Sequence, residues 1–257
     1  MNLKGPNLFL IILIALAALT GCDKAQRMIM EGVPSDTGMD NTLTDMEAKP
    51  VRLVLFIDYP EGGKDAYIEG VDSVAETLQA PEELVRIRAY DNQDSEMRPH
   101  RLVEFDFKSF LDAATYLNRP EIAAIFADFP NHADKVVTYT FIRDSYAKEE
   151  GSDWQIKHVY LIDYVLGGKQ AYLEWVKDVS TEVVSPPQLK AVAAYDNYYG
   201  GSPHRLVAFE FATPEDADAY YALEEVIQTD EAGLENRAGN WSQVLHRFQL
   251  RSDYIHE

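Results

Sequence analysis

The stretch IDYPEGGKDAY at residues 57–67 decides the fold, because it returns as IDYVLGGKQAY at residues 162–172. Two further motifs return with it: AYDN at 89–92 recurs at 194–197, and PHRLV at 99–103 recurs at 203–207. The offset is 105 residues for the first two motifs and 104 for the third, so one residue is missing before the second PHRLV. Loops tolerate such length changes. The sequence therefore predicts one structural unit written twice, with a loop between its AYDN and PHRLV motifs.

Each copy has the pattern β-α-β-β-α-β. Strands are predicted at 53–57, 87–92 and 101–107 in the first copy, and the first of them recurs at 159–162. Apolar residues with helical spacing follow the Gly-Gly turn in both copies, which predicts one buried helix face in each; they are Tyr67, Val71, Val74 and Leu78, and Tyr172, Val176, Val179 and Val183. The second helix is predicted to start at Ser109 and at Thr213. Pro120 is expected to break it in the first copy.

A double difference between the copies predicts the register of the central hairpin. Arg88 and Glu104 both correspond to alanine in the second copy, as expected if the two residues face each other across antiparallel strands. The register then places Tyr90 opposite Leu102 and Asn92 opposite His100. The loss of this charged pair predicts two unequal cavities, the more polar one in the first copy.

The order β-α-β-β-α-β, with about 100 residues per copy, resembles the dimeric α+β barrel superfamily, in which two ferredoxin-like units join their sheets. The resemblance is nearest to its stress-responsive, antibiotic-biosynthesis-monooxygenase and EthD-like branches, and it covers residues 50–257 at the level of topology. It implies an α+β fold with two tandem ferredoxin-like repeats packed as an intramolecular pseudo-dimeric barrel. A monomer is therefore expected.

The N-terminus has the plan of an export signal, since Lys4 precedes an uncharged apolar run at 8–19 that is too short to span a bilayer. Leu19-Thr20-Gly21-Cys22 resembles the lipobox of bacterial lipoproteins, which implies lipidation of Cys22. We predict a signal peptide at 1–21, the acylated cysteine and a flexible tether at 22–49, repeat 1 at 50–147, a linker at 148–155 and repeat 2 at 156–257.

The amino-acid composition excludes several classes of ligand and partner. Cys22 is the only cysteine, so the acylated chain has no thiol for a disulfide or a thiolate metal site. The net charge of −20 argues against nucleic acid as a partner. We expect a protein of the bacterial cell envelope, held to the membrane by its lipid and facing the periplasm or the exterior. Asp23 resembles an inner-membrane retention signal.

The leading candidate site residues surround the repeated hairpin. His100 and His204 each begin a strand, and each faces an asparagine, Asn92 or Asn197. Such a pair would bind a carbonyl or phenol, or the histidine would act as a base; the alternative is that the pair closes the open end of the hairpin. The remaining ligand-binding candidates adjoin these pairs and are Tyr90, Arg101, Tyr195 and Arg205.

Weaker candidates lie around the Gly-Gly turn. Lys64 and Lys169 oppose the helix dipole in the first helical turn, so each is expected to serve an anionic ligand or to pair with the nearby Asp58 or Asp163. Tyr59 and Tyr164 lie at strand ends, where their hydroxyls would line a pocket mouth or pack in the rim. No spacing typical of a metal site is present.

These features favour non-catalytic binding of a small, partly apolar molecule, or of a protein partner, in the barrel. Catalytic residues are not identified. One alternative is a cofactor-free oxygenase or isomerase, or a haem-binding enzyme, using His100 or His204. No cofactor is predicted, although haem remains open as a ligand. The other alternative is a purely structural envelope lipoprotein.

Overall fold

The computed structural model describes residues 49–149 and 154–256. The predicted signal peptide, Cys22, Asp23 and nearly all of the tether lie outside these residues. Within the described ranges, no helix combines the length and the apolar character needed to cross a membrane.

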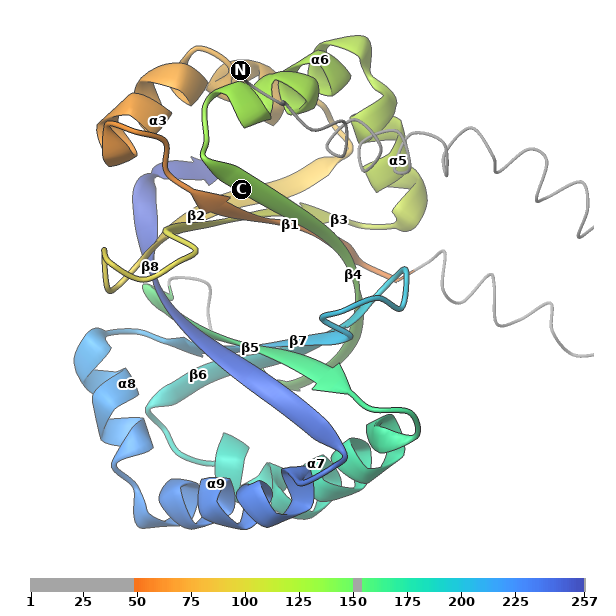
Figure 1. The fold of residues 1–257 in the computed structure, drawn as a ribbon, viewed down its shortest axis with the longest axis vertical. Helices are drawn as coiled ribbons and strands as arrows, with labels where there is room; N and C mark the ends of the chain where they lie inside the picture. The colour runs from red at the N-terminus through yellow and green to blue at the C-terminus, as the bar shows by residue number, and fades with distance from the viewer. Residues whose placement is uncertain (1–48, 150–153, 257) are drawn as a thin grey trace, which may run out of the picture.

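The described residues form an α+β structure around one closed, eight-stranded antiparallel barrel in the order β1-β3-β2-β8-β5-β7-β6-β4 (Figure 1). Each copy contributes four neighbouring strands. The strands are β1 (Val51–Asp58), β2 (Leu84–Asn92), β3 (Arg101–Phe107), β4 (Lys135–Lys148), β5 (Ile156–Tyr164), β6 (Leu189–Asn197), β7 (Arg205–Phe211) and β8 (Trp241–His256).

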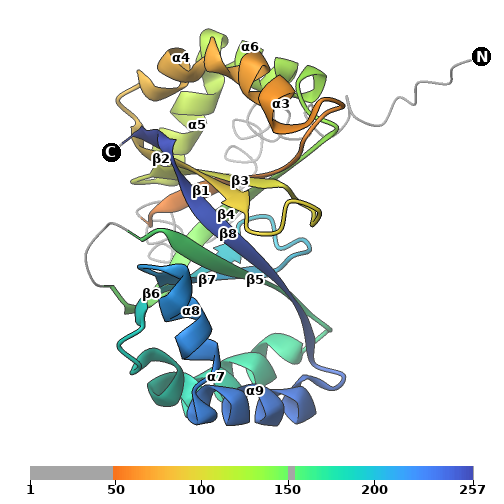
Figure 2. The same ribbon diagram turned by 90° about the vertical axis from the view of Figure 1, so that its left-hand side faces the viewer.

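The long strands β4 and β8 close the barrel because each pairs with both copies. The first part of β4 pairs with β1 through residues 135–142, and its second part pairs with β6 of the other copy. Likewise, β8 pairs first with β5 and then with β2. The two copies therefore share one closed barrel, and Figure 2 shows β8 crossing from β5 to β2.

Helices cover the barrel on two opposite sides (Figures 1 and 2). The first copy supplies α3 (Gly63–Asp72), α4 (Ala75–Gln79), α5 (Phe110–Asn118), α6 (Pro120–Asp128) and the short 3₁₀ helix η1 (Phe129–Asn131). The second copy supplies α7 (Gly168–Val184), α8 (Pro214–Tyr221) and α9 (Glu224–Arg237). Gly62 and Gly167 precede the first helix of each copy with φ values of 95° and 83°, a conformation that explains the repeated glycine.

Local signals in the sequence predicted the helix boundaries well. The hydroxyls of Ser109 and Thr213 accept the backbone N–H groups of Asp112 and Asp216, as expected for N-caps. Pro120 starts a separate helix, as predicted. One prediction needs correction: the first helix of copy one is interrupted between α3 and α4, where the Val74 N–H turns back to the Val71 carbonyl oxygen.

The predicted hairpin register is confirmed in both copies. Arg88 faces Glu104 and Tyr90 faces Leu102, while Ala193 faces Ala208 in the second copy. Outside the ladders, the N–H of Asn92 donates to the carbonyl of His100, and Asn197 bonds in the same way to His204. The missing residue before the second PHRLV motif therefore leaves the paired strands unchanged.

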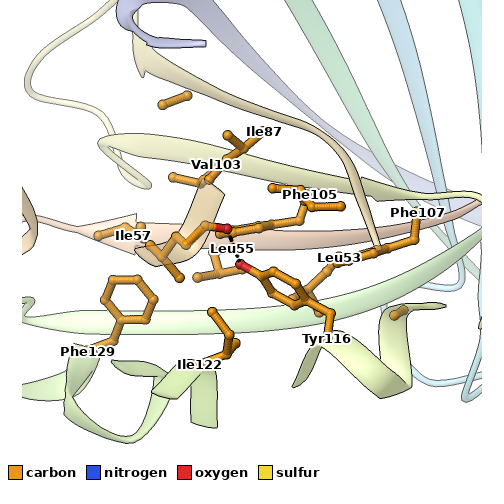
Figure 3. Packing of buried hydrophobic residues seen from close by; sticks show 14 of the residues in the cluster. Leu53, Leu55, Ile57, Ile87, Val103, Phe105, Phe107, Tyr116, Ile122 and Phe129 are labelled. Atoms are coloured by element: carbon orange, nitrogen blue, oxygen red, sulfur yellow. Dashed lines mark hydrogen bonds between the residues drawn. The ribbon is translucent and has the colours of Figure 1, made fainter. Parts of the chain in front are cut away.

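Alternate residues on each strand face the barrel interior or the helices. The interior holds an apolar cluster that includes Val54, Phe141 and Phe248. The helix-facing side of each copy has a core of its own. Figure 3 shows the first of these, where Tyr116 packs among Phe105, Phe107 and Ile122.

Candidate functional site

A cavity of about 560 Å³ lies in the second copy, between its four barrel strands and the helices α7, α8 and α9. Its apolar lining comes from all four predicted helix-stripe residues of the second copy together with aromatic and aliphatic side chains of the strands. Val176, Val179 and Val183 remain partly accessible because their stripe faces this space. The volume is in the range of small-molecule sites, about 300–1,000 Å³.

The corresponding space in the first copy is filled. A void of only about 30 Å³ remains there, beside Leu55, Val103 and Phe105. Phe105 contacts Phe126 at a ring-centroid distance of 5.7 Å, and Phe126 contacts Phe129 at 5.3 Å. Figure 3 shows Phe129 and Ile122 directed toward the strand residues.

Differences between α6 and α9 explain why only one copy is hollow. When the helices are aligned from their N-caps, Arg119 and Leu223, the packing residues of α6 and η1 correspond to smaller or polar residues of α9. In this alignment Ile125, Phe126 and Phe129 become Thr229, Asp230 and Gly233. Loss of this apolar volume leaves α9 unable to fill the space above the sheet.

Trp175 of α7 lies over Gly233 of α9 on the helix side of the cavity. A Cβ atom at Gly233 would come within 2.9 Å of the indole ring, so the glycine makes room for the tryptophan. The residue equivalent to Trp175 in the first copy is Gly70, whose neighbour is His132. The indole Nε1 of Trp175 is buried and has no hydrogen-bond partner within the described residues.

Two tyrosine hydroxyls meet in the cavity. Tyr160 of β5 donates to Tyr221 of α8 at 3.0 Å. Burial raises the pKa of both phenols, so both hydroxyls keep their protons at neutral pH. His158 stacks on the Tyr221 ring at 5.2 Å, and burial together with the charge of Arg247 lowers its pKa to about 4. This imidazole is therefore neutral at pH 7.

Three arginines also line the cavity. Arg205 is buried, forms ion pairs with Asp144 and Asp196 at 2.7 Å each, and lies over the Tyr172 ring. Arg237 pairs with Asp230 at 2.5 Å. Arg247 is exposed and has no ion pair within the described residues. Arg205 was a sequence-predicted candidate, and it is the one leading candidate that lines this cavity.

The predicted histidines lie outside the cavity and close the hairpin ends. Nδ1 of His100 accepts the backbone N–H of Tyr59 at 3.0 Å, and Nδ1 of His204 accepts that of Tyr164 at 3.2 Å. His204 also contacts Asp163 at 3.0 Å. Their asparagine neighbours hold the loop instead of a ligand: Asn92 donates to Pro99 and Asn197 to Pro203 through their side-chain amides.

The turn lysines form ion pairs, but with other partners than predicted. Lys64 pairs with Asp91 at 2.5 Å and Lys169 with Asp196 at 2.9 Å. The expected pairing with Asp58 or Asp163 is wrong, because the strand after the helix brings its AYDN aspartate closer to the turn. Asp58 instead pairs with Arg98, and Asp163 accepts from Ser202.

Asp91 also binds two of the other candidate residues. Asp91 accepts from the Tyr59 hydroxyl at 2.7 Å and from Arg101 at 3.3 Å. Tyr164, the counterpart of Tyr59, has a buried hydroxyl without a hydrogen-bond partner within the described residues, and burial raises its pKa. These contacts explain the repeated motifs as one structural cluster at one end of the strands in each copy.

Tyr90 and Tyr195 point into the barrel, where each receives a cation from the opposite copy. Arg52 lies 4.6 Å from the centre of the Tyr195 ring, and Lys157 lies 4.3 Å from that of Tyr90. Glu104 pairs with Arg52 at 3.1 Å and with Lys157 at 2.5 Å. This buried network joins the two copies.

The prediction that the first copy has the more polar cavity is wrong, although the two copies do differ in cavity volume. Arg88 and Glu104 lie on the barrel face of their strands, since residues of alternate parity face the helices. They cannot add polarity to the space beneath α3 and α4. The hollow copy is the second one.

Sequence reasoning missed Tyr160, Trp175, Tyr221, Arg237 and Arg247. The sequence indicates this site only when the side-chain volumes of the last helices of the two copies are compared. A search for polar motifs retained in both copies favours residues that maintain the shared fold, whereas the cavity arises where the copies differ.

The cavity does not fit haem. An axial haem ligand is normally histidine, cysteine, methionine or tyrosine, and the described lining residues include none of the first three. The tyrosine pair is internally hydrogen bonded, and His158 stacks behind Tyr221. The described residues also contain no cluster of three or more potential metal ligands.

Comparison with known proteins identifies the fold. No family model matches the chain, and no curated protein matches it. A candidate monooxygenase from Fusobacterium nucleatum aligns with a TM-score of 0.62 at 9% identity, covering 82% of this chain and 96% of that one. An anthrone oxidase-like protein aligns with a TM-score of 0.61 at 10% identity, covering 79% and 92%. A candidate chlorite dismutase aligns at 0.55 and 11%, covering 79% and 95%.

These similarities place the chain in the dimeric α+β barrel fold class, as the order of its elements predicted. At such low identities the similarity concerns the fold alone.

Proposed function

We propose that this protein binds a small, partly apolar molecule in the second-copy cavity and does not transform it. The observation that carries this proposal is the contrast between the copies: one has a cavity of about 560 Å³ where the other is packed. A large void without a ligand forfeits packing energy. Its apolar lining and few polar groups are typical of binding sites.

We propose this binding function for a monomeric lipoprotein, as predicted from the sequence. Two ferredoxin-like units, copied in tandem, close one barrel in a monomer, and a lipid on Cys22 holds that barrel at the cell envelope. The first copy then serves as a rigid support, because its helix layer is filled. The second copy carries the ligand.

An oxygenase without a cofactor is the second candidate, favoured by the fold shared with candidate monooxygenases and by the hydroxyl pair in the cavity. His100 and His204 would not be its bases, since neither lines the cavity and each accepts a backbone N–H. A bound apolar molecule recovered after incubation in air distinguishes the two: unchanged mass supports binding, and incorporated oxygen supports the oxygenase.

A filled-cavity variant tests the proposal directly. Thr229→Phe places a large ring where α6 carries Ile125, and Gln228→Phe adds the same ring to an exposed neighbouring position as the control. Binding is followed by the fluorescence of N-phenyl-1-naphthylamine, a neutral apolar probe. Thr229→Phe is expected to weaken binding about tenfold or more, and Gln228→Phe to leave it unchanged. Equal binding by both variants would place the ligand elsewhere.

A further inference from the structure

Three of the residues that line the second-copy cavity carry buried hydrogen-bond donors. The indole Nε1 of Trp175 and the guanidinium Nε atoms of Arg205 and Arg237 are buried without a partner within the described residues. The bond between Tyr160 and Tyr221 uses one of their two hydroxyl protons, so the other is free to donate. Buried donors without acceptors are costly. These three nitrogens have almost no accessible surface, so a ligand in the cavity does not bond to them. The donors left to such a ligand are those of the tyrosine pair and of Arg247.

Charged groups of both signs lie near the tyrosine pair. Arg237, Arg247 and Asp230 are among those that act on Tyr160, and Arg237 is paired with Asp230. Arg247 faces His158 across the β5–β8 ladder, and Leu245 faces Tyr160. Arg247 is therefore the next cavity-facing residue of β8 after Leu245, about 7 Å further along the strand from the position that faces Tyr160.

This cation is notable in a chain whose net charge is −20. Of the three lining arginines, Arg205 and Arg237 have carboxylate partners, whereas Arg247 has none within the described residues. Glu231 also lines the cavity and is exposed. The available positive charge is thus at the tyrosine end of the cavity.

We infer that the ligand is an amphipathic organic acid: an apolar body held against the valines of α7, and one anionic head bound by Arg247 with a hydroxyl of the Tyr160–Tyr221 pair. This inference rests on the proposed binding function. A monoanion suits the site better than a phosphate dianion, because Arg247 is the one lining arginine without an ion pair within the described residues. Carboxylate and sulfonate heads share the required chemistry.

Two probes with the same aromatic body test the charge preference. One is 8-anilinonaphthalene-1-sulfonate, and the other is N-phenyl-1-naphthylamine, which lacks the sulfonate. The wild-type protein should bind the anionic probe more tightly. Arg247→Gln should weaken the anionic probe about fivefold or more and leave the neutral probe unchanged. Arg247→Glu should reverse the preference.

Lys177→Gln is the matched control, because it removes one exposed positive charge from α7 outside the cavity lining. It should keep the preference of the wild-type protein. Equal affinity for both probes, or the same loss in Lys177→Gln as in Arg247→Gln, would overturn the anionic ligand and leave the binding cavity standing. Failure of the wild-type protein to bind either probe would overturn the proposed function itself.

Discussion

Removal of the carboxylate of Glu104 should destabilise the whole barrel. Glu104 is 2% exposed and binds Arg52 of its own copy and Lys157 of the other. Burial opposes its ionisation, but the charges of Arg52 and Lys157 outweigh that effect and lower its pKa. The variant Glu104→Gln keeps the side-chain shape and removes only the charge.

The magnitude follows from the two bonds and from what remains after their loss. Each charged hydrogen bond contributes about 1.5–3 kcal/mol, and breaking one partner of a buried pair costs about 3–5 kcal/mol. Arg52 keeps Asp106 at 2.6 Å and Lys157 keeps Glu210 at 3.1 Å, so the lower end applies. We expect a loss of about 3 kcal/mol, equivalent to about 6–12 °C in Tm for a domain of this size.

Thermal unfolding followed by circular dichroism measures this effect. The matched control is Asp134→Asn, which removes a carboxylate from the exposed pair with Arg98 and should change Tm little. A Glu104→Gln protein with the Tm of the control would contradict a network that joins the two copies through buried charge.

Two further predictions concern single residues. Since burial lowers the pKa of His158 to about 4, the protein should lose stability as pH falls from about 6.5 to 4, by about 3 kcal/mol at the acid end. His158→Leu, which installs the residue found at Leu53 in the first copy, should remove this part of the pH dependence in chemical unfolding; an unchanged slope would refute it. Ser109→Ala and Thr213→Ala should each cost about 1 kcal/mol through loss of an N-cap, measured by urea unfolding. A loss near zero in both would show that these caps are not stabilising.

The sequence predicted the fold well where the signal is local or shared by both copies. The matched loss of Arg88 and Glu104 identified the strand register, because two residues that face each other tend to change together. Ser109, Thr213 and Pro120 marked helix boundaries through backbone chemistry that depends on few neighbours. Comparison of the copies thus supplied information that one copy alone would lack.

The site was harder to predict, because a cavity depends on volumes contributed by several elements. His100 and His204 were chosen as polar residues repeated in a hairpin, but their ring nitrogens serve backbone N–H groups that sequence patterns do not reveal. Lys64 pairs with Asp91 and not with Asp58, because the nearest carboxylate depends on the order of the strands and not on distance along the sequence. Thr229 and Gly233 carry no chemistry of their own. They matter because they are smaller than Ile125 and Phe129, the residues at the equivalent positions of the first copy.

A crystal structure of the protein soaked with N-phenyl-1-naphthylamine tests the central claim most directly. We predict ligand density between α7 and the β5–β8 strands of the second copy, beside Trp175 and the Tyr160–Tyr221 pair. The first copy should remain packed. Density in the barrel interior or beneath α3, or an α9 helix collapsed onto the sheet with no space left, would contradict the account.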